Sequence, residues 1–120
     1  MIVGFGVDLC SVKRMERLAL DNLFLRRVFH EGERDLALGP QGPARLAARW
    51  AAREAFAKAS GLGMAALGFG GVEVVSSPQG PKLVPHSPKA HEVFRRCKVF
   101  LSLSHEGDMA LAAVVLEERT

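Results

Sequence analysis

The first residues of the chain alternate between apolar side chains and small or polar ones, which is the pattern of a β-strand. The strand covers residues 2–9, with Val3, Phe5, Val7 and Leu9 on one face and Ile2, Gly4, Gly6 and Asp8 on the other. We expect the first face to be the core face. The two glycines beside Asp8 would let a ligand or another backbone approach closely. An equally acceptable interpretation is an edge strand with solvent on the Asp8 face, in which Asp8 caps the next segment.

Helical periodicity follows this strand. The predicted segments are a helix over 12–20 capped by Ser11, a second short helix through Val28 capped by Asp21 or Asn22, and a third piece over 31–38. Glycine and proline in residues 39–43 interrupt the helical pattern, so we expect an exposed loop there rather than a domain boundary.

Residues 44–60 give the strongest helix prediction, because alanine dominates, proline is absent and Gly61 supplies a stop. Small residues recur every four positions, and Glu54 and Lys58 fall on the same stripe. If this stripe packs closely against a strand, the two charged side chains point toward that strand. The alternative is an ordinary Glu–Lys pair on a solvated face, which contributes about 0.2–0.5 kcal/mol.

The second half of the chain is mainly β. We expect a strand over 71–76, a turn over 77–80, a strand over 82–85, a helix from Pro88 to about Cys97 capped by Ser87, and strands over 99–104 and 109–117 joined by a hairpin at 105–108. This order predicts an α+β fold in which a mainly antiparallel sheet packs on one long helix. The whole chain, residues 1–120, is expected to be a single domain.

Composition narrows the functional classes. The hydrophobic fraction of 48% predicts a folded chain. The net charge of +3 favours anionic partners. Only 7% of residues are aromatic, which argues against a nucleic-acid-binding surface built on stacking. No apolar run is long enough for a membrane span, and no signal peptide is evident. Two lone cysteines indicate a reducing, cytoplasmic location, and no Cys/His spacing is typical of a zinc site.

The candidate chemistry depends on whether the glycine-lined strand face meets the alanine-lined helix face. Asp8, Glu54 and Lys58 would then converge, and carboxylates with substrate phosphates are what Mg²⁺ prefers. A lysine beside them adds a positive charge for a phosphate. Further cationic and backbone donors for phosphate oxygens are Arg49, Arg53, Gly61 and Gly63. The pattern favours phosphoryl transfer from a polyanionic substrate.

Five segments, in order along the chain, resemble the holo-(acyl-carrier-protein) synthases, the small type of 4′-phosphopantetheinyl transferase. They are Gly4–Leu9 with Lys13–Met15, the helix segment Arg49–Ala59, Gly61–Gly63, the hairpin Val74–Leu83, and Leu103–His105 with Ala110–Glu117. The family usually has lysine at the position of Arg53 and threonine at that of Glu106.

The resemblance implies Mg²⁺-dependent transfer of 4′-phosphopantetheine from coenzyme A to a serine of apo acyl carrier protein, in support of fatty acid biosynthesis. Asp8 and Glu54 would hold Mg²⁺, Glu54 or a water it orients would take the serine proton, and Lys58 would stabilise the leaving phosphate. The implied coenzyme A contacts are Arg49 and His105 at the 3′-phosphate, together with Arg53, Lys58, Gly61, Gly63 and Ser104. The implied carrier-protein contacts are Arg14, Arg26 and Arg27.

The resemblance also implies a homotrimer with sites between subunits. Independently, residues 109–117 are apolar on both faces, so one face needs cover beyond the long helix. A second helix of the same chain could instead supply that cover.

Three other functions stay open: a coenzyme A-binding module without activity, a small basic nucleic-acid-binding domain, and a transferase that accepts polyketide or peptide synthetase carriers.

Overall fold

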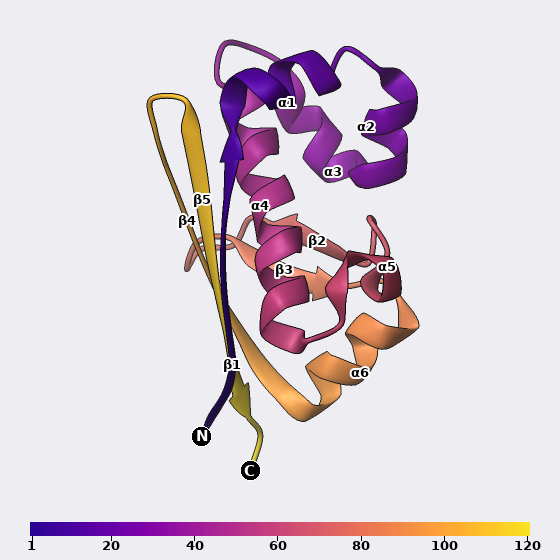
Figure 1. Ribbon diagram of the computed structural model, residues 1–120, viewed down its shortest axis with the longest axis vertical. Helices are drawn as coiled ribbons and strands as arrows, with labels where there is room; N and C mark the ends of the chain where they lie inside the picture. Colours follow the sequence, from indigo (N-terminus) through magenta and orange to yellow (C-terminus); the bar gives the residue numbers. More distant parts are fainter.

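The computed structural model describes residues 1–120, and its core is a three-stranded antiparallel sheet packed on one long helix. The strand order is β1-β5-β4, so the N-terminal strand pairs with the C-terminal one. A separate two-stranded antiparallel sheet is formed by β2 and β3. Figure 1 shows the larger sheet on one side of α4, with the two chain ends close together at the end of the sheet away from α1.

The predicted elements follow one another in the order expected, with one additional short helix, α5. They are β1 (Ile2–Ser11), α1 (Val12–Leu18), α2 (Asn22–Val28), α3 (Glu31–Arg34), a 3₁₀ turn (Asp35–Ala37), α4 (Gly42–Ser60), α5 (Gly63–Leu67), β2 (Val72–Val75), β3 (Lys82–Pro85), α6 (Pro88–Arg96), β4 (Cys97–Glu106) and β5 (Met109–Glu118). The α+β prediction is confirmed, as are the caps at Ser11, Asp21 and Ser87. Helix α5 has no counterpart among the predicted elements, because its five residues include a glycine and are too few to show a period.

The approach of β1 to α4 depends on two glycines. A Cβ atom on Gly4 would overlap the carbonyl oxygen of Ala59, and one on Gly6 would overlap that of Ala55. Only residues without a side chain let the strand lie this close to the helix backbone. The glycine-lined face and the alanine-lined face therefore meet, which confirms the condition on which the candidate chemistry depends.

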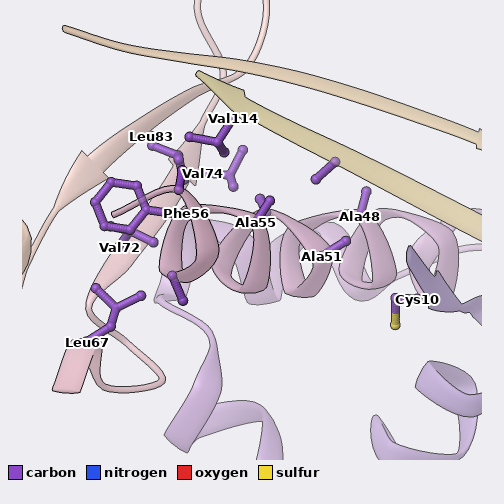
Figure 2. Close-up of a cluster of buried hydrophobic side chains, with 14 of the residues drawn as sticks. Cys10, Ala48, Ala51, Ala55, Phe56, Leu67, Val72, Val74, Leu83 and Val114 are labelled. Atoms are coloured by element: carbon purple, nitrogen blue, oxygen red, sulfur yellow. The ribbon is translucent and has the colours of Figure 1, made fainter. Parts of the chain in front are cut away.

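A single hydrophobic cluster of 24 buried residues joins the two sheets through α4. Figure 2 shows alanine side chains of α4 lying beneath β5, with Phe56 beside Val72 and Leu83. Four inward residues of β5 are buried against the helix: Ala110, Ala112, Val114 and Leu116. None of the helices has the length and apolar composition that a membrane crossing requires.

The assignment of the core face of β1 was wrong. Val3, Phe5, Val7 and Leu9 are exposed, whereas Gly6 is buried and Asp8 is half-buried. The glycine face packs on α4 because small residues allow backbone contact, and the large apolar side chains consequently point away from the helix. Register places Phe5 beside Val115 of β5, which in turn pairs with Phe100 of β4. One chain thus leaves an apolar sheet face uncovered.

Candidate active site

The contact between β1 and α4 brings Asp8 and Lys58 together. The ammonium of Lys58 donates to the carboxylate Oδ1 of Asp8 at 2.9 Å and to the backbone carbonyl of Val7 at 3.0 Å. Asp8 is mostly shielded, with 18% of its side chain exposed, and Lys58 remains 55% exposed. This ion pair links side chains fifty residues apart, and the alternative of a solvent-facing Asp8 does not hold.

Glu54 lies one helical turn before Lys58 and close enough to Asp8 to be affected by its charge. Burial and then the Asp8 carboxylate raise the pKa of Glu54, while Lys58 and Arg14 act in the opposite direction. Two carboxylates in one partly desolvated site repel each other, and a cation between them would relieve that repulsion. The donor set, two carboxylates beside an ammonium, fits a hard divalent cation and a phosphate.

The tip of the β4–β5 hairpin is fastened to the start of α1. Asp108 accepts from the Ser11 hydroxyl at 2.9 Å and from the Lys13 amide at 2.8 Å, and its carbonyl accepts from the Val12 amide at 2.7 Å. The Lys13 amide and then the Ser11 hydroxyl lower the pKa of Asp108. Asp108 thereby fixes the hairpin that carries His105 relative to the helix that carries Arg14. The sequence showed Ser11 as a cap but gave no sign of this second, long-range partner.

Arg53 lies in the core and is fully buried. Its guanidinium makes a bidentate contact with the carboxylate of Glu33, in which Nη1 lies 2.9 Å from Oε2 and Nη2 donates to Oε1. The Nε of Arg53 donates to the carbonyl of Phe69 at 2.7 Å. Glu33 also accepts from the amides of His30 and Val74, both at 3.0 Å. These partners hold the fully buried Arg53 guanidinium inside the chain, and this arrangement does not favour the coenzyme A contact expected of Arg53.

Arg49 lies on a different side of α4 from the charged centre. It is nine positions before Lys58, which at about 100° per residue places it roughly opposite on the helix. It is half-buried, its Nη1 donates to the Arg45 carbonyl at 3.1 Å, and burial lowers the pKa of its guanidinium. The structure does not bring Arg49 to the Asp8–Lys58 pair within one chain.

Gly61 forms the helix stop that the sequence predicts, and Gly63 follows it with a similar left-handed backbone. Gly61 and Gly63 both have positive φ, at 73° and 74°, and Gly61 ends α4 one turn from Lys58. Ser104 and His105 are exposed near the end of β4 and line a shallow pocket together with Leu9 and Leu111. Because β5 lies between β4 and β1, they are about 10 Å across the sheet from the β1 backbone. They do not contact Asp8, Glu54 or Lys58 within one chain.

The three arginines predicted to meet a carrier protein are all exposed. Arg14 lies on α1, and Arg26 and Arg27 lie in the last turn of α2. Figure 1 shows both helices at the end of the molecule where the β4–β5 hairpin has its tip, with α1 between that tip and α2.

Comparison with known proteins identifies the family of the chain. The family model of the 4′-phosphopantetheinyl transferase superfamily matches residues 4–114. This chain belongs to that superfamily. Among curated relatives, the holo-[acyl-carrier-protein] synthase of Geotalea daltonii is 38% identical, with 98% of this chain and all of the relative aligned. The enzyme of the same name from Streptococcus uberis is 35% identical, with 98% of both chains aligned.

Solved structures of the family have the same fold. The holo-(acyl-carrier-protein) synthase of Bacillus anthracis, solved in complex with CoA (3′,5′-ADP), is 34% identical with a TM-score of 0.82 over 99% of both chains. That of Neisseria meningitidis is also 34% identical, with a TM-score of 0.84 over 98% of this chain and all of the other. The family identified from the five sequence segments is confirmed, and so is its fold.

Proposed function

We propose that this transferase moves 4′-phosphopantetheine from coenzyme A to a serine hydroxyl of apo acyl carrier protein, as a step that supports fatty acid biosynthesis. The serine oxygen forms a bond to the phosphorus that carries pantetheine. The bond from that phosphorus to the adenosine-side phosphate breaks, and adenosine 3′,5′-bisphosphate leaves. The serine proton goes to a base.

The observation that carries the proposal is the meeting of Asp8, Glu54 and Lys58 where β1 lies against α4. Lys58 is held 2.9 Å from Asp8, and Glu54 is close enough for the Asp8 charge to raise its pKa. We assign Asp8 and Glu54 as the residues that would hold Mg²⁺, which neutralises pyrophosphate charge when bound. The family also supports the proposal, because the holo-(acyl-carrier-protein) synthase of Bacillus anthracis was solved in complex with CoA (3′,5′-ADP).

The side chains of this chain then have distinct tasks. Glu54, directly or through a water it orients, accepts the serine proton, since its raised pKa makes it a stronger base than an ordinary carboxylate. Lys58 is more than half exposed, so its ammonium can turn from Asp8 toward the leaving phosphate. Gly63, which has positive φ, offers its backbone amide close to this lysine for further phosphate oxygens, whereas the Gly61 amide donates to the Lys58 carbonyl at 3.2 Å.

Incubation of the protein with coenzyme A, Mg²⁺ and apo acyl carrier protein tests this function. We expect the intact mass of the carrier to increase by one phosphopantetheine group. Bound coenzyme A with an unmodified carrier would instead support the binding module. Neither binding nor transfer, together with retention of nucleic acid, would support the nucleic-acid alternative. Equal rates on fatty acid, polyketide and peptide synthetase carriers would identify the relaxed-specificity transferase.

Carrier docking through the basic surface of α1 and α2 is part of the same proposal, and it gives a prediction for Arg14. The Arg14→Glu variant should raise the KM for the carrier several-fold and leave coenzyme A binding nearly unchanged, because exposed charges mainly steer encounter. The wild-type rate should also fall as salt increases. Steady-state kinetics with each substrate varied in turn, at two salt concentrations, measures both effects.

The exposed Arg95 on α6 provides a matched control, and Arg95→Glu should leave the carrier KM unchanged. An unaltered carrier KM in Arg14→Glu, combined with a rate insensitive to salt, would show that the carrier binds another surface.

We further propose that the enzyme acts as a homotrimer, with each site completed by a neighbouring copy. Two observations support it. The outer face of the sheet exposes a continuous apolar surface that includes Phe5, Val7, Leu9, Phe100 and Met109. Surfaces of this kind usually mark an interface. In addition, Ser104 and His105 lie away from Asp8 and Glu54 in one chain, and a second copy placed against this face would bring such residues closer to the same coenzyme A.

Replacing Phe5 by Glu should therefore dissociate the assembly and remove most of the activity. A charge at the centre of an apolar interface lacks both water and a partner, and its burial is strongly unfavourable. Sedimentation equilibrium should give a mass near three chains for the wild type and one chain for the variant. Leu20→Glu, at an exposed apolar position after α1, is the control. A fully active wild-type species with the mass of one chain would reject the trimer.

The remaining parts of the proposal concern domain and location. One hydrophobic cluster connects both sheets, which supports a single domain over residues 1–120.

Both cysteines are free and buried, and burial raises the pKa of Cys10 to about 11, so its thiol is unreactive. This supports action in a reducing cytoplasm.

A further inference from the structure

Three metal-ligating side chains converge at a place that the proposed transfer reaction does not use. His30 precedes α3, Glu73 lies on β2, and His86 follows β3. One ligand atom from each residue lies within 4.8 Å of the other two. The three come from separate segments of the chain, so no local sequence spacing indicates them.

The tautomer of His30 suits a ligand. Its Nε2 lies 2.8 Å from the carbonyl oxygen of Gly70, and because a carbonyl can only accept, this nitrogen carries the hydrogen. Nδ1 therefore has the lone pair, and it faces the Glu33 amide in the capping box at the start of α3, so a metal ion would take the place of that contact. A histidine that binds a metal usually donates its other ring N–H to a carbonyl or carboxylate, which fixes the tautomer and the ring.

Glu73 and His86 are already paired. His86 Nε2 lies 2.8 Å from Glu73 Oε1, and the two imidazole rings stack with centroids 3.9 Å apart. Bonds of about 2.0–2.2 Å to a tetrahedral Zn²⁺ separate a nitrogen and an oxygen ligand by roughly 3.3 Å. The pair must therefore open by about half an ångström, and the His86 ring must turn out of the stack so that its lone pair converges with that of the fixed His30 ring. The His86 side chain is 40% exposed, which leaves room for that rotation and a path for the ion.

We propose that His30, Glu73 and His86 form an accessory site for a transition-metal cation of the Zn²⁺ type. Two imidazoles and one carboxylate favour Zn²⁺ over Mg²⁺, which prefers oxygen ligands. Water completes the coordination. The site differs in place and donor type from the Asp8–Glu54 pair. It ties the start of α3 to the β2–β3 sheet, beside the buried Glu33 that accepts from the His30 and Val74 amides.

The expected consequence is stabilisation of the fold on metal binding. A cation that binds the folded chain and not the unfolded one raises the unfolding midpoint, by roughly 10 °C at a hundredfold excess over the dissociation constant. Loss of one ligand should weaken binding by at least about tenfold, since even second-shell changes commonly cost that much.

The test is a calorimetric titration of the full chain with ZnCl₂ in excess Mg²⁺, with unfolding midpoints measured with and without Zn²⁺. Glu73→Gln and His86→Ala remove ligands, and His86→Asn is a second variant if alanine destabilises the fold. His91→Ala removes an exposed histidine from α6 as a matched control. Asp8→Asn removes one carboxylate of the Asp8–Glu54 pair and tests whether Zn²⁺ binds there instead. Co²⁺ in place of Zn²⁺ gives an absorption spectrum that reports nitrogen ligation.

We expect one Zn²⁺ per chain in the wild type, His91→Ala and Asp8→Asn, and at least tenfold weaker binding in the ligand variants. The midpoint increase should disappear with the ligands. Either of two results would overturn the site: no saturable binding by the wild type, or equal binding by wild type and by folded Glu73→Gln and His86→Asn variants.

Discussion

Replacing Asp8 by Asn or Glu54 by Gln is expected to reduce phosphopantetheine transfer by at least about a hundredfold, more than typical second-shell changes at metal sites. Each change keeps the size of the side chain and removes one negative charge. The remaining carboxylate then holds a divalent cation weakly. Asp8→Asn also deprives Lys58 of the partner that it contacts at 2.9 Å. Mass analysis of the carrier over time measures the loss.

The fold should survive both changes, because Glu54 and Asp8 are partly exposed and amides can still hydrogen-bond. Thermal unfolding midpoints close to wild type would establish this. Glu92→Gln, at an exposed position on α6, is the matched control and should keep full activity. An active Asp8→Asn or Glu54→Gln enzyme, or full wild-type activity in excess chelator, would contradict the assignment of a shared cation.

Local patterns predicted most of the fold because each element has a local cause. Ser11, Asp21 and Ser87 cap helices with their own side chains, and Gly61 ends α4 with a positive φ. The Asp8–Glu54–Lys58 centre was also accessible from sequence, since glycines on one face and alanines on another both indicate close backbone contact.

Long-range choices were harder to predict. The alternation of residue types showed that β1 has two different faces. The face with the larger apolar side chains is not the buried one, because the close contact between the β1 and α4 backbones requires the glycine face. Arg53 looked like a phosphate ligand because its partner Glu33 lies on another helix, twenty residues away. The capping of α1 by Asp108 and the convergence of His30 with Glu73 and His86 likewise depend on tertiary structure alone.

The Glu33–Arg53 pair should carry the largest effect on stability. Both side chains are fully buried, and Glu33 accepts from two backbone amides as well as from the guanidinium. Arg53→Met leaves a buried carboxylate without its counter-charge, and Glu33→Gln leaves a buried guanidinium. Breaking such a pair from one side costs about 3–5 kcal/mol of unfolding free energy. For a chain of this length the midpoint should fall by roughly 10 °C or more.

Denaturant unfolding of both single variants and of the double variant separates pairing from packing. If the charges compensate each other, the double variant should lose less than the sum of the single losses, with a coupling of about 0.5–3 kcal/mol. Arg45→Met, at an exposed position on the same helix, should change stability by no more than about 0.5 kcal/mol. Additive losses would mean that Glu33 acts through the amides of His30 and Val74 rather than through Arg53. In that case the ion pair itself does not stabilise the packing of α3, α4 and β2.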